Sequence, residues 1–201
     1  MLIVAAPAHA QRVVDNQDRY DDIFRKYSKR FFGVGFDWHY FKAQGLAESG
    51  LDPKARSPVG ARGVMQLMPG TYAMIKKARS EQFGAIEDPE WNIAAGILFN
   101  RDLWHVWADN PDEQERLRFM FGSYNAGQGT IKRATTVARA KQLDTHTWKS
   151  IEVVAPNVRR WRYTETLPYV RKIEENHKTL AGAGRNKLRK KTPADSTGRA
   201  R

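Results

Sequence analysis

The chain has 201 residues, of which 41% are hydrophobic, and a formal net charge of +12. This length and apolar content are enough for one domain with a core, and the positive charge favours an anionic partner. Because the chain has no cysteine, disulfides and thiolate metal sites are excluded. Its five histidines show no metal-ligand spacing, so we expect no metal or other cofactor.

The first eleven residues, MLIVAAPAHAQ, resemble the end of a secretory signal peptide. A short apolar run leads into Ala-His-Ala, a small-x-small pattern typical of a cleavage site. The usual charged opening is missing, since no Lys or Arg precedes Arg12, and a frayed apolar terminus is the alternative. We expect residues 1–11 to be a signal-peptide remnant and the protein to be exported to the periplasm or cell envelope. No run of the sequence reaches transmembrane length.

Apolar residues three to four apart predict a single, compact, mainly α domain over residues 12–181. In chain order, helices are expected over about 15–33, 37–48, 69–83, 88–111, 112–127, 130–142 and 164–180, with a short helix inside 148–163. Asp37 is predicted to cap the second helix. Residues 49–63 are rich in Pro and Gly, which predicts a loop. No alternating pattern is long enough for a central sheet, although the loops leave room for a short hairpin.

The last twenty residues, 182–201, carry seven basic side chains and one Asp, which is half of the net charge. Few of them are suited to a core, so we expect a flexible, disordered basic tail. A nucleic-acid binder that uses this tail is one hypothesis, and it predicts binding that is lost with salt. An acidic polymer such as cell wall suits the modest charge of the remaining chain equally well, and no nucleic-acid partner is expected.

Glu48 stands out because of its position in the predicted second helix. It falls in the last turn, where the helix dipole is negative, and Trp38, Phe41 and Leu46 make its segment apolar. Both effects disfavour the anion and raise the carboxyl pKa. A glutamate that stays protonated near neutral pH is what a general acid requires. The alternative is an ordinary exposed glutamate.

The residues that follow supply polar groups suited to a sugar. In SPVGARGVMQ, Ser57 offers a hydroxyl to a carboxylate, and Gln66 both donates and accepts hydrogen bonds. Met68 is suited either to a groove or to the core. In GSYNAG, Tyr124 and Asn125 precede a helix-ending glycine; the alternatives here are a core tyrosine and a C-cap asparagine.

Four motifs occur together in a fixed order: AESGLDPKARSPVGARGVMQLMPGT, DPEWNIAAG, SYNAG and ETLPYVRKI. In this order they resemble the motif set of the soluble-type lytic transglycosylases, whose catalytic domain is similar to goose-type lysozyme. The resemblance covers about residues 18–178. It implies a lysozyme-like fold, peptidoglycan glycan strands as the substrate, and no cofactor; we also expect a monomer.

The resemblance also implies residue roles. Glu48, in the Glu-Ser pair, matches the single catalytic acid/base. Substrate-binding roles fall to Ser57, Gln66, Met68, Tyr124, Asn125, Glu165 and Tyr169. Two positions depart from the family pattern: Val64 replaces the usual Leu before Met-Gln, and Ser123 replaces the usual Ala before Tyr-Asn, which adds a hydroxyl that needs a partner.

The implied reaction cleaves the β-1,4 bond between N-acetylmuramic acid and N-acetylglucosamine without water and leaves 1,6-anhydro-muramyl ends. Ordinary glycosidases use two carboxylates, and Asp52, four residues after Glu48, is expected to be a local cap. Glu165 is the residue that would change this interpretation. A second carboxyl group across the cleavage site from Glu48 is able to hold a water molecule, which would make the reaction a hydrolysis. A hydrolytic muramidase on the same fold and a non-catalytic wall-binding protein are therefore the alternatives.

Overall fold

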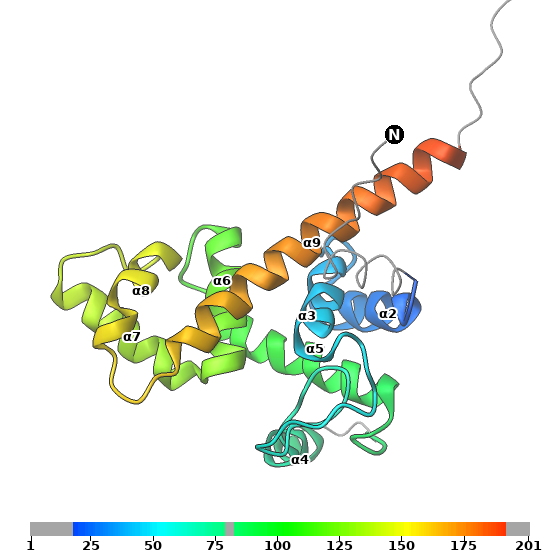
Figure 1. Cartoon of the computed structure of the whole chain (residues 1–201), viewed down its shortest axis with the longest axis horizontal. Coiled ribbons are helices and arrows are strands. Elements are labelled where there is room, and N and C mark those ends of the chain that lie inside the picture. Colours follow the sequence, from blue (N-terminus) through cyan, green and yellow to red (C-terminus); the bar gives the residue numbers. More distant parts are fainter. Residues whose placement is uncertain (1–17, 79–82, 192–201) are drawn as a thin grey trace, which may run out of the picture.

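The computed structural model describes residues 18–78 and 83–191. Within them the fold is helical, as predicted, and Figure 1 shows the arrangement. The elements are α2 (Asp21–Phe32), α3 (His39–Ser49), α4 (Pro69–Ala78), α5 (Pro89–Val106), α6 (Glu113–Ala126), α7 (Gln128–Ala140), α8 (Trp148–Val154), the 3-10 helix η1 (Ala155–Asn157) and α9 (Tyr163–Lys191). The only β pairing among the described residues is two isolated bridges in the loop after α3, Arg56–Arg62 and Arg62–Leu67.

Several helix ends differ from the prediction. Helix α9 continues to Lys191, so the expected boundary at residue 181 falls inside a helix; the rest of the expected tail, 192–201, and the expected signal remnant, 1–11, lie outside the described residues. Phe83, the predicted end of α4, is not helical. Residue Trp38 rather than Asp37 directly precedes α3, although Asp37 Oδ1 still accepts a hydrogen bond from the backbone N–H of His39 at 3.0 Å.

The core forms around α5 and α6. Helix α5 packs against α2, α4 and α6, while α9 packs along both α3 and α6. In Figure 1, α9 crosses the molecule as a long diagonal between the α2–α5 side and the α7–α8 side. Ile93, Ile97, Phe119 and Met120 are fully or almost fully buried between these helices. Burying such apolar side chains contributes roughly 1.5–3 kcal/mol each, so this packing fixes the helix ends from which the site is built.

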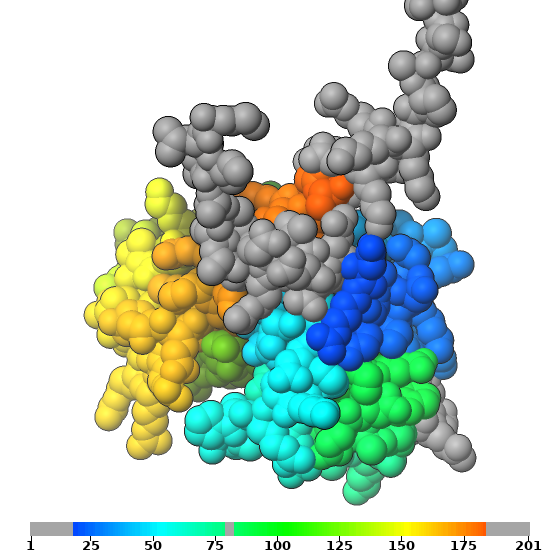
Figure 2. All heavy atoms as spheres, turned by 45° about the vertical axis from the view of Figure 1, so that its right-hand side comes forward, coloured from blue at the N-terminus to red at the C-terminus, as the bar shows by residue number. Residues whose placement is uncertain are grey.

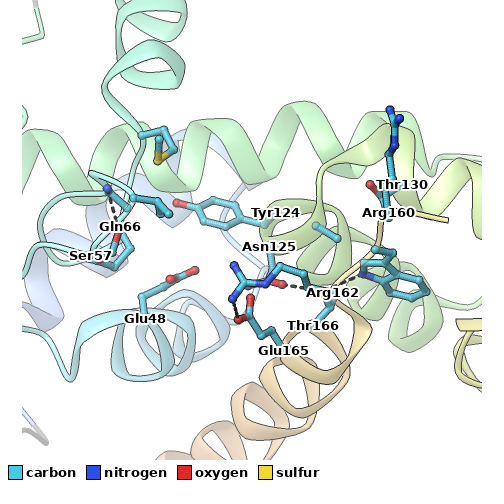
Figure 3. A pocket seen from close by; sticks show the side chains of 15 residues that line it. Glu48, Ser57, Gln66, Tyr124, Asn125, Thr130, Arg160, Arg162, Glu165 and Thr166 are labelled. Atoms are coloured by element: carbon cyan, nitrogen blue, oxygen red, sulfur yellow. Dashed lines mark hydrogen bonds and ion pairs between the residues drawn. The ribbon is translucent and has the colours of Figure 1, made fainter. Parts of the chain in front are cut away.

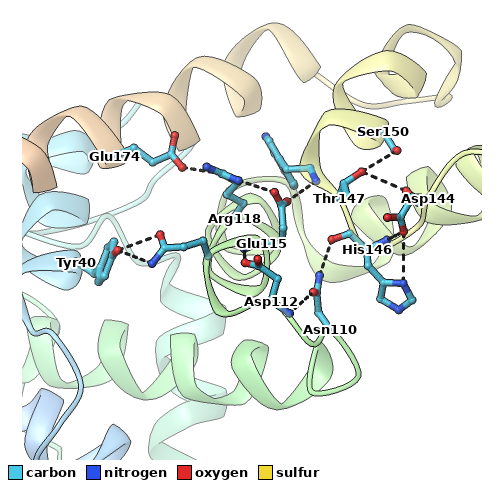
Figure 4. A network of polar contacts seen from close by, with 12 residues as sticks. Tyr40, Asn110, Asp112, Glu115, Arg118, Asp144, His146, Thr147, Ser150 and Glu174 are labelled. Carbon is cyan, nitrogen blue, oxygen red and sulfur yellow. Dashed lines mark hydrogen bonds and ion pairs between the residues drawn. The ribbon is translucent and has the colours of Figure 1, made fainter.

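Charged side chains join α6 to its neighbours (Figure 4). Arg118 on α6 donates to Glu174 of α9 at 2.7 Å and to Glu115 at 2.6 Å. Glu115 in turn accepts a hydrogen bond from the backbone N–H of Trp148, the first residue of α8, at 2.6 Å. A carboxylate at a helix N-terminus satisfies a free N–H and suits the dipole. This network therefore fixes α8 and α9 relative to α6.

Candidate active site

A pocket of about 510 Å³ opens where three parts of the chain meet. In Figure 2 the surface is hollowed between the cyan segment after α3 and the yellow and orange segments that lead into α9. Figure 3 shows the side chains that line the pocket. They belong to Glu48, Ser57, Val59, Ala61, Gln66, Met68, Tyr124, Asn125, Ala126, Thr130, Arg160, Trp161, Arg162, Glu165 and Thr166. Every residue predicted for the site except Tyr169 is among them.

Glu48 reaches the pocket from the last turn of α3. The helix ends there because Gly50 and Leu51 both adopt left-handed backbone angles, with φ of 66° and 64°. Their N–H groups return to the carbonyls of Leu46 and Gly45 at 3.1 and 3.3 Å, which is a Schellman-type ending. Ser49, the residue after Glu48, donates its hydroxyl to the carbonyl of Val64 at 2.8 Å and so ties the helix end to the following loop.

Burial makes Glu48 a poor anion. Desolvation raises the pKa of its carboxyl to about 8, against the smaller lowering effects of a hydrogen bond from Tyr169 and the positive charge of Lys172. The sequence also predicted a raised pKa for Glu48, from the helix dipole and the apolar segment around it. The Tyr169 hydroxyl donates to Glu48 Oε1 at 2.6 Å. At neutral pH the group is therefore mostly protonated, as a general acid must be.

Tyr169 lies beneath the carboxyl and not on the open pocket. It is buried, and burial together with the charge of Glu48 raises the pKa of its phenol well above the usual range, so the phenol keeps its proton. The sequence assigned it a substrate contact from the last helix. Its position instead indicates that Tyr169 acts through Glu48, by orienting the carboxyl.

Two buried amide side chains behind Tyr169 were not predicted from the sequence. Gln44 on α3 donates to the Tyr169 hydroxyl oxygen at 3.0 Å, and Asn100 on α5 donates to the Gln44 carbonyl at 2.6 Å. Both amides are fully buried. Because Gln44 occupies the hydroxyl oxygen as a donor, the single phenolic proton is directed to Glu48. A polar residue inside a buried helix face was the only available signal, and such residues are usually structural.

The loop over Glu48 is held by α5. The Asn92 side chain accepts from the N–H of Met65 at 2.8 Å and donates to the carbonyls of Arg62 and Ile86 at 3.0 and 2.9 Å. Gly63 lies against it with φ of 75°, and an added Cβ would lie 2.5 Å from the Asn92 amide nitrogen. Asn92 of the DPEWNIAAG motif therefore holds the loop that follows Glu48, a function that the sequence did not reveal.

Within this loop the predicted side chains serve the loop as well as the pocket. Gln66 has φ of 45°, and its amide nitrogen donates to the carbonyls of Gly63 and Ala55 at 2.9 and 3.2 Å. Ser57 accepts from the N–H of Ala61 at 3.0 Å. These hydrogen bonds hold both side chains on the pocket wall. Each side chain can still form further hydrogen bonds.

The end of α6 forms the opposite wall. Tyr124 donates a hydrogen bond from its hydroxyl to the carbonyl of Met65 at 2.8 Å. This bond connects α6 to the loop on the other side of the pocket. Asn125 accepts from Thr166 at 2.7 Å, and Thr166 accepts from Trp161 at 2.9 Å. The Asn125 amide is exposed, and because its oxygen is engaged, its nitrogen is free to donate.

Glu165 sits on the rim of the same pocket, in the first turn of α9. Its side chain is 52% exposed and forms an ion pair with Arg162. Asp52, the other candidate for a second acid, accepts the N–H of Lys54 at 2.9 Å and is not part of the pocket lining. Arg160, Arg162, Thr130 and Trp161 complete the wall, and none of these four was predicted from the sequence.

The profile of the transglycosylase SLT domain matches residues 33–147, more than half of the chain. The chain belongs to this family. A membrane-bound lytic murein transglycosylase F of Desulfosudis oleivorans is 32% identical over 161 residues, 79% of this chain and 33% of the relative. The enzyme of the same name from Vibrio campbellii is 30% identical over 79% of this chain and 28% of its own length. The SLT-domain chain thus spans about a third of these relatives.

The fold comparison agrees with the sequence comparison. The crystal structure of the 70 kDa soluble lytic transglycosylase of Escherichia coli superposes with a TM-score of 0.62 and 27% identity, over 80% of the SLT-domain chain and 24% of the larger protein. This confirms the predicted lysozyme-like helical class. Among the described residues, no helix is both long and apolar enough to span a bilayer.

The structure accommodates both departures from the family pattern. Val64 is fully buried and contacts the helix that carries Glu48, where an added Cβ on Gly45 would lie 3.3 Å from it. Ser123 is also fully buried, and its hydroxyl accepts from the indole N–H of Trp107 at 2.9 Å. The extra hydroxyl therefore has the partner that burial requires.

Proposed function

We propose that the SLT-domain chain is a peptidoglycan lytic transglycosylase that cleaves the bond between N-acetylmuramic acid and N-acetylglucosamine and leaves 1,6-anhydro-muramyl ends. One observation carries this proposal: a half-buried Glu48 on the wall of an open pocket, with its pKa raised to about 8 and Tyr169 donating to one oxygen. The relatives are named as lytic murein transglycosylases, which supports the same substrate, and the structural neighbour is named as a lytic transglycosylase, which supports the same reaction.

The chemistry assigned to Glu48 has two proton transfers. The protonated carboxyl first donates to the glycosidic oxygen, which leaves with the N-acetylglucosamine side, while the substrate's own N-acetyl oxygen relieves the charge at the muramyl C1. The resulting carboxylate then removes the proton from the muramyl C6 hydroxyl, and that oxygen bonds to C1. Glu48 ends the cycle protonated, and no water is consumed.

A hydrolytic muramidase is the second candidate, because Glu165 provides another carboxyl on the same pocket. Its ion pair with Arg162 and its exposure argue against a base that holds one water in place. We therefore assign Glu165 to the substrate-facing rim. The remaining predicted contacts, Ser57, Gln66, Met68, Tyr124 and Asn125, are proposed to bind the glycan from the other walls.

Mass spectrometry of products from purified peptidoglycan tests both candidates. The proposal expects anhydro-muramyl ends from the wild type, and loss of turnover with retained fold for Glu48→Gln. Glu165→Gln is the matched control and is expected to give the same anhydro product. Reducing muramyl ends, or substantial activity in Glu48→Gln, would contradict the assignment.

We also propose an exported protein acting at the periplasm or cell envelope, where its substrate lies. The relatives are named as membrane-bound enzymes, and the proposed signal remnant gives the route. Fractionation of cells that produce the full chain tests this: the protein is expected outside the cytoplasm, and retention in the cytoplasm would refute the proposal.

A further inference from the structure

One face of α9 donates three hydrogen bonds to α3, the helix that carries Glu48. The pairs are Tyr169 with Glu48, Lys172 with the carbonyl of Ala47 at 3.2 Å, and Asn176 with the carbonyl of Ala43 at 3.0 Å. The three donors are three and four positions apart, so they lie on the same side of their helix, and α9 packs along α3 (Figure 1). Lys172 is the one donor of these three that carries a charge.

Lys172 lies at the C-terminal end of α3 without a counter-ion. The Ala47 carbonyl is among the last four of this helix, which lack a partner inside the helix, and a cation there suits the negative end of the helix dipole. The positive charge of Lys172 acts on Glu48. Within residues 18–78 and 83–191, however, the Lys172 ammonium makes no ion-pair contact with Glu48 or with another carboxylate. The Ala47 carbonyl therefore holds the charge near the acid but out of contact with it.

A neutral donor would be sufficient to bind the end of the helix. Asn176 makes the same kind of contact with α3 one turn further along α9, and its amide carries no charge. Lys172 is half-buried, and a cation that loses water without gaining a counter-ion is costly. The hydrogen bond alone does not account for a lysine at this position, which indicates that its charge has a function.

The remaining groups around Glu48 do not replace this charge. Neutral groups face Glu48 from α9, from α6 and from the loop after α3: Tyr169, Tyr124, Ser57 and Gln66. Burial raises the pKa of both phenols well above the usual range, so both keep their protons. The exposed charges on the pocket wall are Arg160, Arg162 and Glu165. None of these three shifts the pKa of Glu48, whereas Lys172 lowers it against the effect of burial.

The proposed reaction needs Glu48 first as a neutral acid and then as a carboxylate base. A cation in direct contact would keep the carboxylate ionised and leave no proton for the first transfer. With no cation, the anion would form in a buried position with little to stabilise it. We propose that Lys172 is a positioning residue for this reaction: from the Ala47 carbonyl it stabilises the carboxylate that Glu48 becomes between the two proton transfers, and it keeps its own proton throughout. The inference rests on the proposed function.

The first test measures kcat and KM on purified glycan strands against pH. Lys172→Gln removes the charge and keeps an N–H donor, Lys172→Arg keeps both, and Lys178→Gln, which changes an exposed lysine of the same helix, is the control. For Lys172→Gln, the alkaline limb of kcat is expected to move up by roughly one pH unit, and kcat is expected to fall roughly tenfold. KM should stay near the wild-type value because Lys172 does not line the pocket. Lys172→Arg and the control should match the wild type.

Titration of the Glu48 carboxyl by carbon NMR, without substrate, gives a readout that is independent of turnover. Its midpoint is expected to rise in Lys172→Gln and in Lys172→Met, a second neutral variant that lacks the donor, and to stay unchanged in Lys172→Arg. A helix cap alone would lower stability and leave the midpoint and the alkaline limb unchanged. That result, or failure of both neutral variants to fold, would overturn the proposal. If the wild type cleaves no glycan, the proposed function fails, and the NMR titration still decides whether Lys172 stabilises the carboxylate.

Discussion

Glu48→Gln is expected to stabilise the folded protein increasingly as the pH rises. Burial raises the pKa of Glu48 from its usual 4.5 to about 8. Between these values the unfolded chain has lost the proton while the folded protein retains it, so the stability of the wild type falls as the pH rises through this window. The full difference corresponds to about 5 kcal/mol, at roughly 1.4 kcal/mol per pKa unit, and is an upper bound.

Glutamine removes this cost because it is never charged, and its side-chain carbonyl still accepts the hydrogen bond from Tyr169. Urea denaturation of the wild type and the variant, repeated from about pH 5 to about pH 9, measures the effect. The two free energies of unfolding should be similar near pH 5 and differ by at least about 2 kcal/mol above pH 8. Glu165→Gln is the control, because an exposed ion pair contributes little at any pH.

Parallel stability curves for the wild type and Glu48→Gln across this range would refute the reasoning. They would show that Glu48 ionises as easily in the folded protein as in the unfolded chain. The carboxyl would then be an anion at neutral pH, and the proton required for the first step would have to come from elsewhere.

Three further predictions follow from contacts around the pocket. Tyr169→Phe removes a hydrogen bond that lowers the pKa of Glu48, so the alkaline limb of the pH–rate profile should move to higher pH while the fold is kept; an unchanged limb would count against the positioning role. Gln44→Leu should lower kcat more than it raises KM, since it frees the Tyr169 hydroxyl to turn, and steady-state kinetics on one glycan decides this. Asn92→Ala leaves the N–H of Met65 and the carbonyl of Ile86 without these partners, while the carbonyl of Arg62 keeps its hydrogen bond from Leu67. The variant should cost about 2–4 kcal/mol in urea denaturation; a loss below about 0.5 kcal/mol would show that the loop does not depend on Asn92.

Most of the helices and most of the pocket were predictable from the sequence because they depend on local patterns. Apolar spacing located the helices. The start of α5 is likewise fixed locally, since Asp88 accepts a hydrogen bond from the N–H of Glu90 at 2.8 Å. The four motifs identified Glu48 and most of the polar side chains that line its pocket from three parts of the chain. The end of α9 was missed because the basic composition after residue 181 says little about where a long helix stops.

What only the tertiary structure decided is how distant side chains meet. Gln44 and Asn100 are polar residues on apolar helix faces, and nothing local distinguishes a buried hydrogen-bond relay from an ordinary buried amide. Arg133 on α7 and the pair Arg159 and Arg160 before α9 line one pocket, although they come from two separate segments of the chain. The sequence by itself identified most of the residues that are proposed to carry chemistry, because residue type and helix period are local. Long-range packing decides which of them lie next to Glu48 and which lie elsewhere on the pocket wall. The same packing produces the partial burial that raises the pKa of Glu48.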